Sequence, residues 1–226
     1  MNEGKITYRF KTPIYPGNIL YVNLIGQYAC TNDCVFCTRP RTKKDIGKSN
    51  IYEKKAESFL YLSRSPSAKK VLSEIEENIN KGDKEIAIIG LGEPLIYFDK
   101  VLQVIKSIKS KHKIKVRIDT NGQVECYHKN CASKLAKAGL DEIRISLNAI
   151  NEEDYNKICR PKHRDAFKNL LKFIIECKKQ RMVTKVSFVT GFKIYGISAK
   201  REKEYVLFAN EIGIKKENII LRMFVK

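Results

Sequence analysis

The chain has 226 residues and a net charge of +19, from 44 lysines and arginines against 25 aspartates and glutamates. This length allows one domain with a sizeable buried core. No segment approaches the roughly 20 apolar residues that a membrane-spanning helix requires, so we expect a cytoplasmic protein with no membrane partner. The charge suits a polyanionic partner such as RNA, or a small acidic substrate, although lysine-rich surfaces are also common in thermophiles.

The cysteine content argues against a secreted domain built on disulfides. There are seven cysteines, an odd number, and three of them are crowded into residues 30–37. Secreted domains use paired cysteines spread along the chain. We therefore expect reduced thiols that are kept for metal binding.

Residues 1–17 are expected to form an N-terminal extension with one short strand. A turn containing Pro13, Pro16 and Gly17 separates the run 6–11 from the apolar run 19–25, and residues of this kind end strands. The run 19–25 predicts a buried strand, so the cysteines begin just past its C-terminal end.

The cysteine loop 30–37 has the spacing CxxxCxxC, from Cys30, Cys34 and Cys37. Thiolates are soft ligands, and three of them from one loop can hold three irons of a [4Fe–4S] cluster and leave the fourth iron free. The alternative is a structural zinc site, which needs a fourth ligand from elsewhere. Candidates for that ligand are His128, Cys126 and Cys131.

From residue 66 onward the chain alternates helices and strands. Helices are predicted over 66–80, with Ser65 as its cap, and near 97–110, 130–138, 165–180 and 200–212. Strands are predicted over 85–90, 114–119, 142–147, 185–190 and 219–224. With 19–25 these make six parallel strands, joined by right-handed crossovers in an open sheet or a barrel. We expect a single domain over 1–226.

Polar residues on one face of several strands leave two interpretations open. Arg144 and Ser146 alternate with apolar residues in 142–147, as Arg117 and Asp119 do in 114–119, and Arg222 interrupts the last strand. Charges inside an α/β fold are costly unless they are paired or bound to a ligand. The faces therefore predict either a polar ligand site or an internal ion-pair network.

Three strands end in short clusters of small and polar residues. The clusters are Gly90-Leu91-Gly92-Glu93-Pro94, Thr120-Asn121-Gly122 and Ser146-Leu147-Asn148. In parallel α/β folds these strand ends open on one face, which we call the mouth. Glycines there allow the backbone to approach a ligand, and Glu93 adds a carboxylate.

These features resemble the radical SAM superfamily, enzymes that cleave S-adenosylmethionine at a [4Fe–4S] cluster. Phe36 before the last cysteine completes the superfamily's cluster loop, and Leu91-Gly92-Glu93-Pro94 is similar to its Gly-Gly-Glu-Pro turn, with Leu91 replacing a glycine. The superfamily fold is a partial (β/α)6 TIM-like barrel. Within it, FLYLSRSPSAKKVLSEIEE and SLNAINEEDYNKICRP look most like the TatD-linked radical SAM proteins.

The resemblance implies a function and a set of binding residues. The three cysteines would hold the cluster, and S-adenosylmethionine would chelate the fourth iron, its amino group held by Glu93 and by backbone groups around Gly90, Gly92 and Pro94. Asn121, Ser146 and Asn148 would lie near its carboxylate and ribose. A low-potential electron donor is implied, and the substrate is not. The alternatives are a zinc-stabilised nucleic-acid-binding module and a catalytically silent, cluster-binding scaffold.

The remaining cysteines and the basic residues give two further expectations. Cys126, Cys131 and Cys159 are expected near the mouth, where a second cluster is conceivable, and Cys177 is expected in the core. Basic residues follow the strand ends and predict an anionic substrate at the mouth, with RNA less favoured because no aromatic platform accompanies them. They are Arg39, Arg41, Lys43, Lys44, Lys48, Arg160, Lys162, Arg164 and Lys193.

Overall fold

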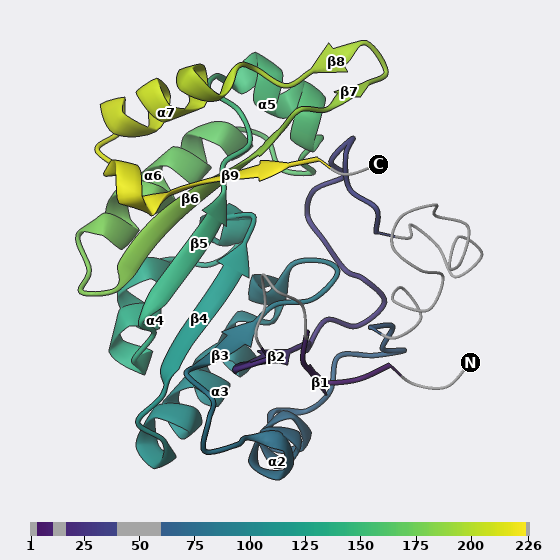
Figure 1. Cartoon of the computed structure of the whole chain (residues 1–226), viewed down its shortest axis with the longest axis vertical. Coiled ribbons are helices and arrows are strands. Elements are labelled where there is room, and N and C mark those ends of the chain that lie inside the picture. The colour runs from purple at the N-terminus through teal and green to yellow at the C-terminus, as the bar shows by residue number, and fades with distance from the viewer. Residues whose placement is uncertain (1–3, 11–16, 40–59, 225–226) are drawn as a thin grey trace.

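The computed structural model describes residues 4–10, 17–39 and 60–224 (Figure 1). Its main feature is a seven-stranded sheet in the order β1-β2-β3-β4-β5-β6-β9. The strands are β1 (Thr7–Tyr8), β2 (Ile19–Val22), β3 (Glu85–Ile88), β4 (Lys115–Thr120), β5 (Glu142–Ser146), β6 (Val183–Thr190) and β9 (Ile219–Met223). The last six are parallel, and β1 pairs antiparallel with β2 at the edge. The predicted six parallel strands and the short N-terminal strand are therefore confirmed.

Helices connect the parallel strands and cover one side of the sheet. They are α2 (Ala68–Asn78), α3 (Phe98–Lys111), α4 (Cys131–Ala138), α5 (Glu152–Cys159), α6 (Ala166–Lys178) and α7 (Glu202–Glu211). Figure 1 shows α4 and α6 on one side of the sheet and the segment 23–39 on the other. No helix in the described ranges is long and apolar enough to cross a membrane.

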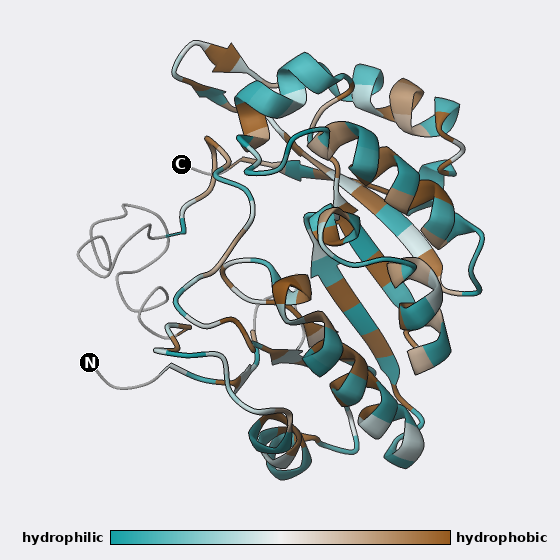
Figure 2. Ribbon diagram, turned by 180° about the vertical axis from the view of Figure 1, so that it is seen from behind, coloured by the Kyte–Doolittle hydropathy of each residue, from teal (hydrophilic) through white to brown (hydrophobic). Residues whose placement is uncertain are grey.

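The core forms where apolar strand faces meet apolar helix faces. Ile86 and Ile88 of β3, Val116 and Ile118 of β4, and Ile143 of β5 are all fully buried in one cluster. The helices contribute residues at helical spacing, and in Figure 2 the strands alternate between hydrophobic and hydrophilic bands. The period of two places the polar residues of each strand on the opposite, inner face.

Two local expectations need correction. Ser65 does not cap the first predicted helix: Ser67 does, through its hydroxyl and the Lys70 N–H at 3.2 Å, and the helix begins at Ala68. The Ser65 hydroxyl instead donates to the Leu24 carbonyl at 2.6 Å. The sequence analysis also missed α5 and the small hairpin of β7 (Lys193–Ile194) and β8 (Ile197–Ser198).

The inner face carries an ion-pair network. Arg117 is buried and pairs through Nε with Glu85 at 2.6 Å and through Nη1 with Asp119. Lys115 pairs with Glu85 at 2.9 Å and with Glu142 at 2.7 Å. Of the two interpretations, the internal network is thus present, and it supplies the partners that buried charges need.

We predict that replacing the central arginine will destabilise the fold. Arg117→Met leaves Glu85 and Asp119 short of a partner in a buried setting, and breaking such a pair costs about 3–5 kcal/mol. Urea unfolding measures the change, with Arg201→Met as the control because Arg201 pairs with Glu204 on the exposed surface of α7. A loss below about 1 kcal/mol, the range of exposed ion pairs, would contradict the prediction.

Candidate active site

The cysteine loop leaves β2 and runs along the ends of the strands. Cys30 and Cys34 are partly buried and Cys37 is exposed, and the Cys37 N–H donates to the Cys34 carbonyl at 3.0 Å. In the described part of the chain, no three His, Cys, Asp or Glu side chains lie close enough together to hold a metal ion. The structure therefore shows the three thiols in one loop without gathering them into a finished site.

The end of α5 holds the loop in place through its backbone. The Asp33 N–H donates to the Cys159 carbonyl at 3.0 Å, and the Val35 N–H donates to the Ile158 carbonyl at 2.9 Å. The sequence contained a signal for this helix: Asn151 caps its N-terminus and three acidic residues fill its first turn. The missed helix is thus part of the site.

A buried tyrosine gives the loop a second point of attachment. Tyr155 of α5 has no exposed surface, and its hydroxyl accepts from Asn32 Nδ2 at 3.1 Å and from Gln123 Nε2 at 2.7 Å. Asn32 lies between Cys30 and Cys34, so this contact joins the cysteine loop to the segment after β4. Neither Tyr155 nor Gln123 was predicted as a site residue.

Arg39 holds the loop instead of lining the mouth as an anion ligand. Its guanidinium donates to the Tyr28 carbonyl at 2.6 Å and to the Asn32 carbonyl at 3.0 Å. Both carbonyls lie next to the cysteines at the start of the loop. Four other basic residues expected at the mouth, Arg41, Lys43, Lys44 and Lys48, lie outside the described residues.

The Gly-Glu-Pro turn packs directly against the start of the cysteine loop. The Glu93 N–H donates to the Ala29 carbonyl at 2.8 Å. Gly92 has φ +135°, and a Cβ there would lie 2.4 Å from the Ala29 oxygen. At Gly90 a Cβ would lie 2.3 Å from Asn23 Oδ1. Gly92 is therefore required by its positive φ and by the nearby backbone, and a side chain at Gly90 would have to displace the buried Asn23.

Glu93 is buried with neutral partners only. It is 1 % exposed and accepts from the Leu95 N–H at 2.9 Å, the Thr120 hydroxyl at 2.7 Å and the Asn121 N–H at 2.6 Å. Within the described residues no cation pairs with it. Burial raises the pKa of Glu93 from 4.5 to about 7, although the three hydrogen bonds oppose the shift. Such a carboxylate favours a positively charged ligand.

Asn121 connects the end of β4 to the cysteine loop. Its Nδ2 donates to the Thr31 hydroxyl at 2.8 Å and lies 3.7 Å from Cys30 Sγ, while its Oδ1 accepts from the Gln123 N–H. The structure thus brings Asn121 together with Cys30, as expected for residues of one site.

The other predicted contact residues are placed differently. Ser146 is partly buried and is the C-terminal residue of β5. Phe36 packs against Phe192, with ring centroids 5.4 Å apart. Asn148 is buried: its Oδ1 accepts from the Val189 N–H at 3.2 Å and its Nδ2 lies 3.9 Å from Cys159 Sγ. Asn148 therefore connects the end of β5 to β6 and to α5 in this structure.

The donor set fits an iron–sulfur cluster. Burial, followed by the nearby Glu93, raises the pKa of the Cys30 thiol to about 11, so loading a metal must displace its proton. The Asn32 N–H lies 3.4 Å from Cys30 Sγ and donates to it, as Asn121 does. Hydrogen bonds of this kind stabilise the negative charge of a cluster sulfur and tune its potential.

The remaining cysteines do not form a second site among the described residues. Cys131, Cys159 and Cys177 are buried in the core, which confirms the prediction for Cys177 and corrects it for the first two. Cys126 is partly buried, donates to Gln123 Oε1 at 3.4 Å and accepts from Asn169. The described residues also bring no fourth ligand for zinc to the cysteine loop.

Besides Arg39, four predicted mouth cations are described, and all four are exposed: Arg160, Lys162, Arg164 and Lys193. The Lys162 N–H donates to the Thr31 carbonyl at 2.9 Å, which places this group beside the cysteine loop. Arg160 lies over the Tyr195 ring at 5.9 Å, connecting α5 to the β7–β8 hairpin. The structure therefore places the exposed residues Arg160 and Lys162 beside the cysteine loop.

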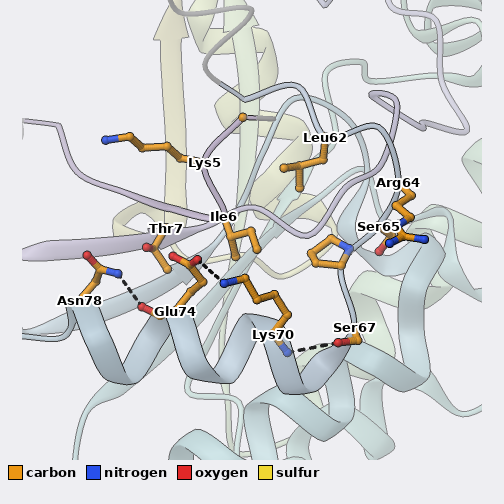
Figure 3. Close-up of a pocket in the computed structure, with 12 residues that line it drawn as sticks. Lys5, Ile6, Thr7, Leu62, Arg64, Ser65, Ser67, Lys70, Glu74 and Asn78 are labelled. Carbon is orange, nitrogen blue, oxygen red and sulfur yellow. Dashed lines mark hydrogen bonds and ion pairs between the residues drawn. The ribbon is translucent and has the colours of Figure 1, made fainter. Parts of the chain in front are cut away.

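A hollow lies between the N-terminal segment and α2 (Figure 3). Its volume is about 930 Å³, and it is walled by residues that include Ile6, Leu62 and Glu74. Lys70, on its wall, pairs with Glu74 at 2.9 Å. No residue predicted for the site lines this hollow.

We predict that Glu93 makes stability depend on pH in the protein without added cofactor. A carboxyl whose pKa rises from 4.5 to about 7 on folding contributes stability that is complete below pH 4.5 and is lost as the pH rises to 7. The loss is about 3 kcal/mol. Glu93→Gln removes it, so the free energy of unfolding of the variant relative to the wild type should rise over this range. A difference that stays flat with pH would contradict the prediction.

Comparison with known proteins adds relatives to this geometry. The chain is 32 % identical over 132 residues to a probable GTP 3′,8-cyclase of Methanocaldococcus jannaschii, a match that covers 58 % of this chain and 41 % of that protein. The chain thus spans about two fifths of the length of the curated relatives it matches.

Solved structures share the fold at low sequence identity. Streptococcus suis SuiB bound to S-adenosylmethionine superposes with a TM-score of 0.62 at 19 % identity, over 92 % of this chain and 42 % of that one. The structure of TYW1 with a lysine-pyruvate adduct gives 0.56 at 18 % identity, over 92 % and 65 %. The partial TIM-like barrel is thereby confirmed. A family model described as the radical SAM superfamily matches residues 24–199, more than three quarters of the sequence. The chain therefore belongs to the radical SAM superfamily.

Proposed function

We propose that this protein is an enzyme that uses a [4Fe–4S] cluster to cleave S-adenosylmethionine reductively and acts on an anionic substrate. One observation carries the proposal: the Gly-Glu-Pro turn packs on the cysteine loop through the hydrogen bond from Glu93 to Ala29. This contact joins a three-thiol loop to a buried carboxylate that lacks a cationic partner among the described residues. The superfamily's two cofactors need both.

The residues of the chain would divide the work as follows. Cys30, Cys34 and Cys37 hold the cluster, and Glu93 binds the α-ammonium group of S-adenosylmethionine, which supplies the missing cation. The bound cofactors supply a 5′-deoxyadenosyl radical. Phe36 packs on Phe192 beside the loop and keeps water from the cluster.

Asn121 and Ser146 are proposed to contact the methionyl carboxylate and the ribose. Asn121 is already held beside Cys30, and Ser146 is the C-terminal residue of β5. Asn148 joins the end of β5 to β6 and α5 in this arrangement, because both the oxygen and the nitrogen of its side-chain amide have protein contacts. Its predicted contact with the cofactor would require those contacts to change.

The substrate is proposed from charge. Arg160 and Lys162 are exposed beside the cysteine loop, and Arg164 and Lys193 are exposed on the segments that follow β5 and β6, so this side of the protein attracts an anion. The curated relatives include enzymes named for GTP, a polyanion. An RNA substrate is the second form of such an anion, and binding that weakens steeply with salt would distinguish it. A low-potential electron donor completes the set of partners. The likeness to TatD-linked members stays a prediction.

We predict that the loop thiols are required for turnover and that Cys126 is not. Protein reconstituted anaerobically with iron and sulfide, then given dithionite and S-adenosylmethionine, should form 5′-deoxyadenosine. Cys34→Ala should abolish this product, because one iron loses its protein ligand. Cys126→Ala is the matched control and should retain it. A wild-type yield no greater than that of Cys34→Ala would contradict the proposal and favour a catalytically silent scaffold.

We further predict one cluster per chain. Iron analysis of the reconstituted protein should give about four irons, because the described residues offer no second group of ligands. A brown protein with this content excludes the zinc-stabilised alternative, since zinc proteins are colourless. About eight irons per chain would contradict the prediction and indicate an auxiliary cluster.

A further inference from the structure

The inner face of the sheet carries more positive than negative charge. We define it by the strand side chains that alternate with the buried apolar ones. Its charged members are Lys115, Arg117, Arg144, Lys185 and Arg222 against Glu85, Asp119 and Glu142. Five cations thus face three carboxylates. Ion pairing within the face leaves two positive charges in excess.

The cations differ in how fully the protein satisfies them. Arg117 is enclosed between Glu85 and Asp119, and Lys115 bonds two carboxylates. These residues form the closed part of the network. They hold the floor of the face and have little capacity left for a ligand.

Three cations retain donors that no described residue uses. Arg144 donates only through its Nε, to Glu142 at 2.5 Å, and Lys185 pairs with the same carboxylate at 3.3 Å. Arg222 donates through its Nη2 to Asp119 at 3.2 Å. Each guanidinium has five N–H donors and each ammonium three. Their side chains are 25 %, 24 % and 45 % exposed, so the unused donors are open to a ligand.

Strand register brings these three side chains together. Arg144 and Lys185 are direct partners on neighbouring strands β5 and β6, which places them about 5 Å apart. Arg144 is also the register partner of Asp119 on β4. Because Arg222 of β9 contacts that same Asp119, the sheet curves enough to bring β9 over to β4 across the two strands between them. The three cations therefore surround one region of the inner face.

We propose that this region binds an oxyanion of the substrate, a phosphate or a carboxylate, between Arg144, Lys185 and Arg222. Arginine presents a planar pair of donors that matches both groups, and the excess of two charges balances a dianion. The inference rests on the proposed function and deepens it: the exposed mouth cations attract the anionic substrate, and the inner-face cations hold its oxyanion group inside the barrel. Asp119 precedes Thr120, which donates to Glu93. The anion would therefore lie next to the cofactor site.

Binding of simple anions tests the proposal without turnover. Inorganic phosphate, pyrophosphate and succinate are titrated calorimetrically into reconstituted protein loaded with S-adenosylmethionine, at constant chloride. We expect the wild type to bind at least one of them, and the preferred probe tells phosphate from carboxylate. Arg144→Gln and Arg222→Gln should each weaken that binding by about tenfold, the worth of a charge-assisted hydrogen bond.

Controls separate this site from other causes of anion binding. Arg201→Gln removes an exposed arginine that pairs with Glu204 on α7 and should bind the probe as the wild type does. Arg222 lies on the edge strand with an exposed side chain, so its variant keeps the test valid if Arg144→Gln unfolds, which circular dichroism reports.

Three results would overturn the inference. The first is that the wild type binds no probe, and the second is that Arg201→Gln loses as much affinity as Arg144→Gln and Arg222→Gln. The third is that the probes bind only when S-adenosylmethionine is left out, which would assign the cations to the carboxylate of the cofactor. The proposed function fails separately. If the wild-type protein binds the probes but never forms 5′-deoxyadenosine, the anion site is supported and the proposed enzymatic function is contradicted.

Discussion

A backbone hydrogen bond between two distant segments organises the site. The Glu93 N–H reaches the Ala29 carbonyl at 2.8 Å, and Gly92 is required there because a Cβ would collide with the same oxygen. The contact fixes the cysteine loop over the ends of β3 and β4 and buries the Glu93 carboxylate behind it. Everything that we propose for the cofactors depends on this closeness, since a chelated amino acid must touch the metal loop and the carboxylate at once.

Burial of charge is the second constraint, and the chain meets it in two ways. On the inner face, carboxylates and cations pair: burial opposes ionisation, but hydrogen bonds from Lys115 and Arg144 lower the pKa of Glu142 to about 2. At the mouth, Glu93 has only neutral donors and its pKa rises. The paired network stabilises the sheet, whereas the unpaired carboxylate costs stability until a cation arrives. That contrast separates a structural charge from a binding one.

Much of this arrangement follows from sequence, and the exceptions have physical causes. Strand alternation predicted six parallel strands and the polar inner face, because a period of two is a local property. Whether Arg117 and Asp119 bind a ligand or each other was undecidable, since Glu85 comes from another strand and only register brings it near. Helix α5 was not predicted, because a helix of eight residues carries only a weak periodic signal. Its C-terminal end nevertheless holds the cysteine loop. Contacts between segments far apart in sequence decided each case.

Titration of S-adenosylmethionine into the reduced, cluster-loaded protein, followed by electron paramagnetic resonance, tests the shared site most directly. If the loop and the Gly-Glu-Pro turn bind one ligand together, the cofactor will change the cluster spectrum of the wild type. Glu93→Gln lacks the negative charge that faces the ammonium group of the cofactor. It will need about tenfold more cofactor for the same change. A wild-type spectrum that S-adenosylmethionine leaves unaltered, or equal titration curves for the two proteins, would contradict the account.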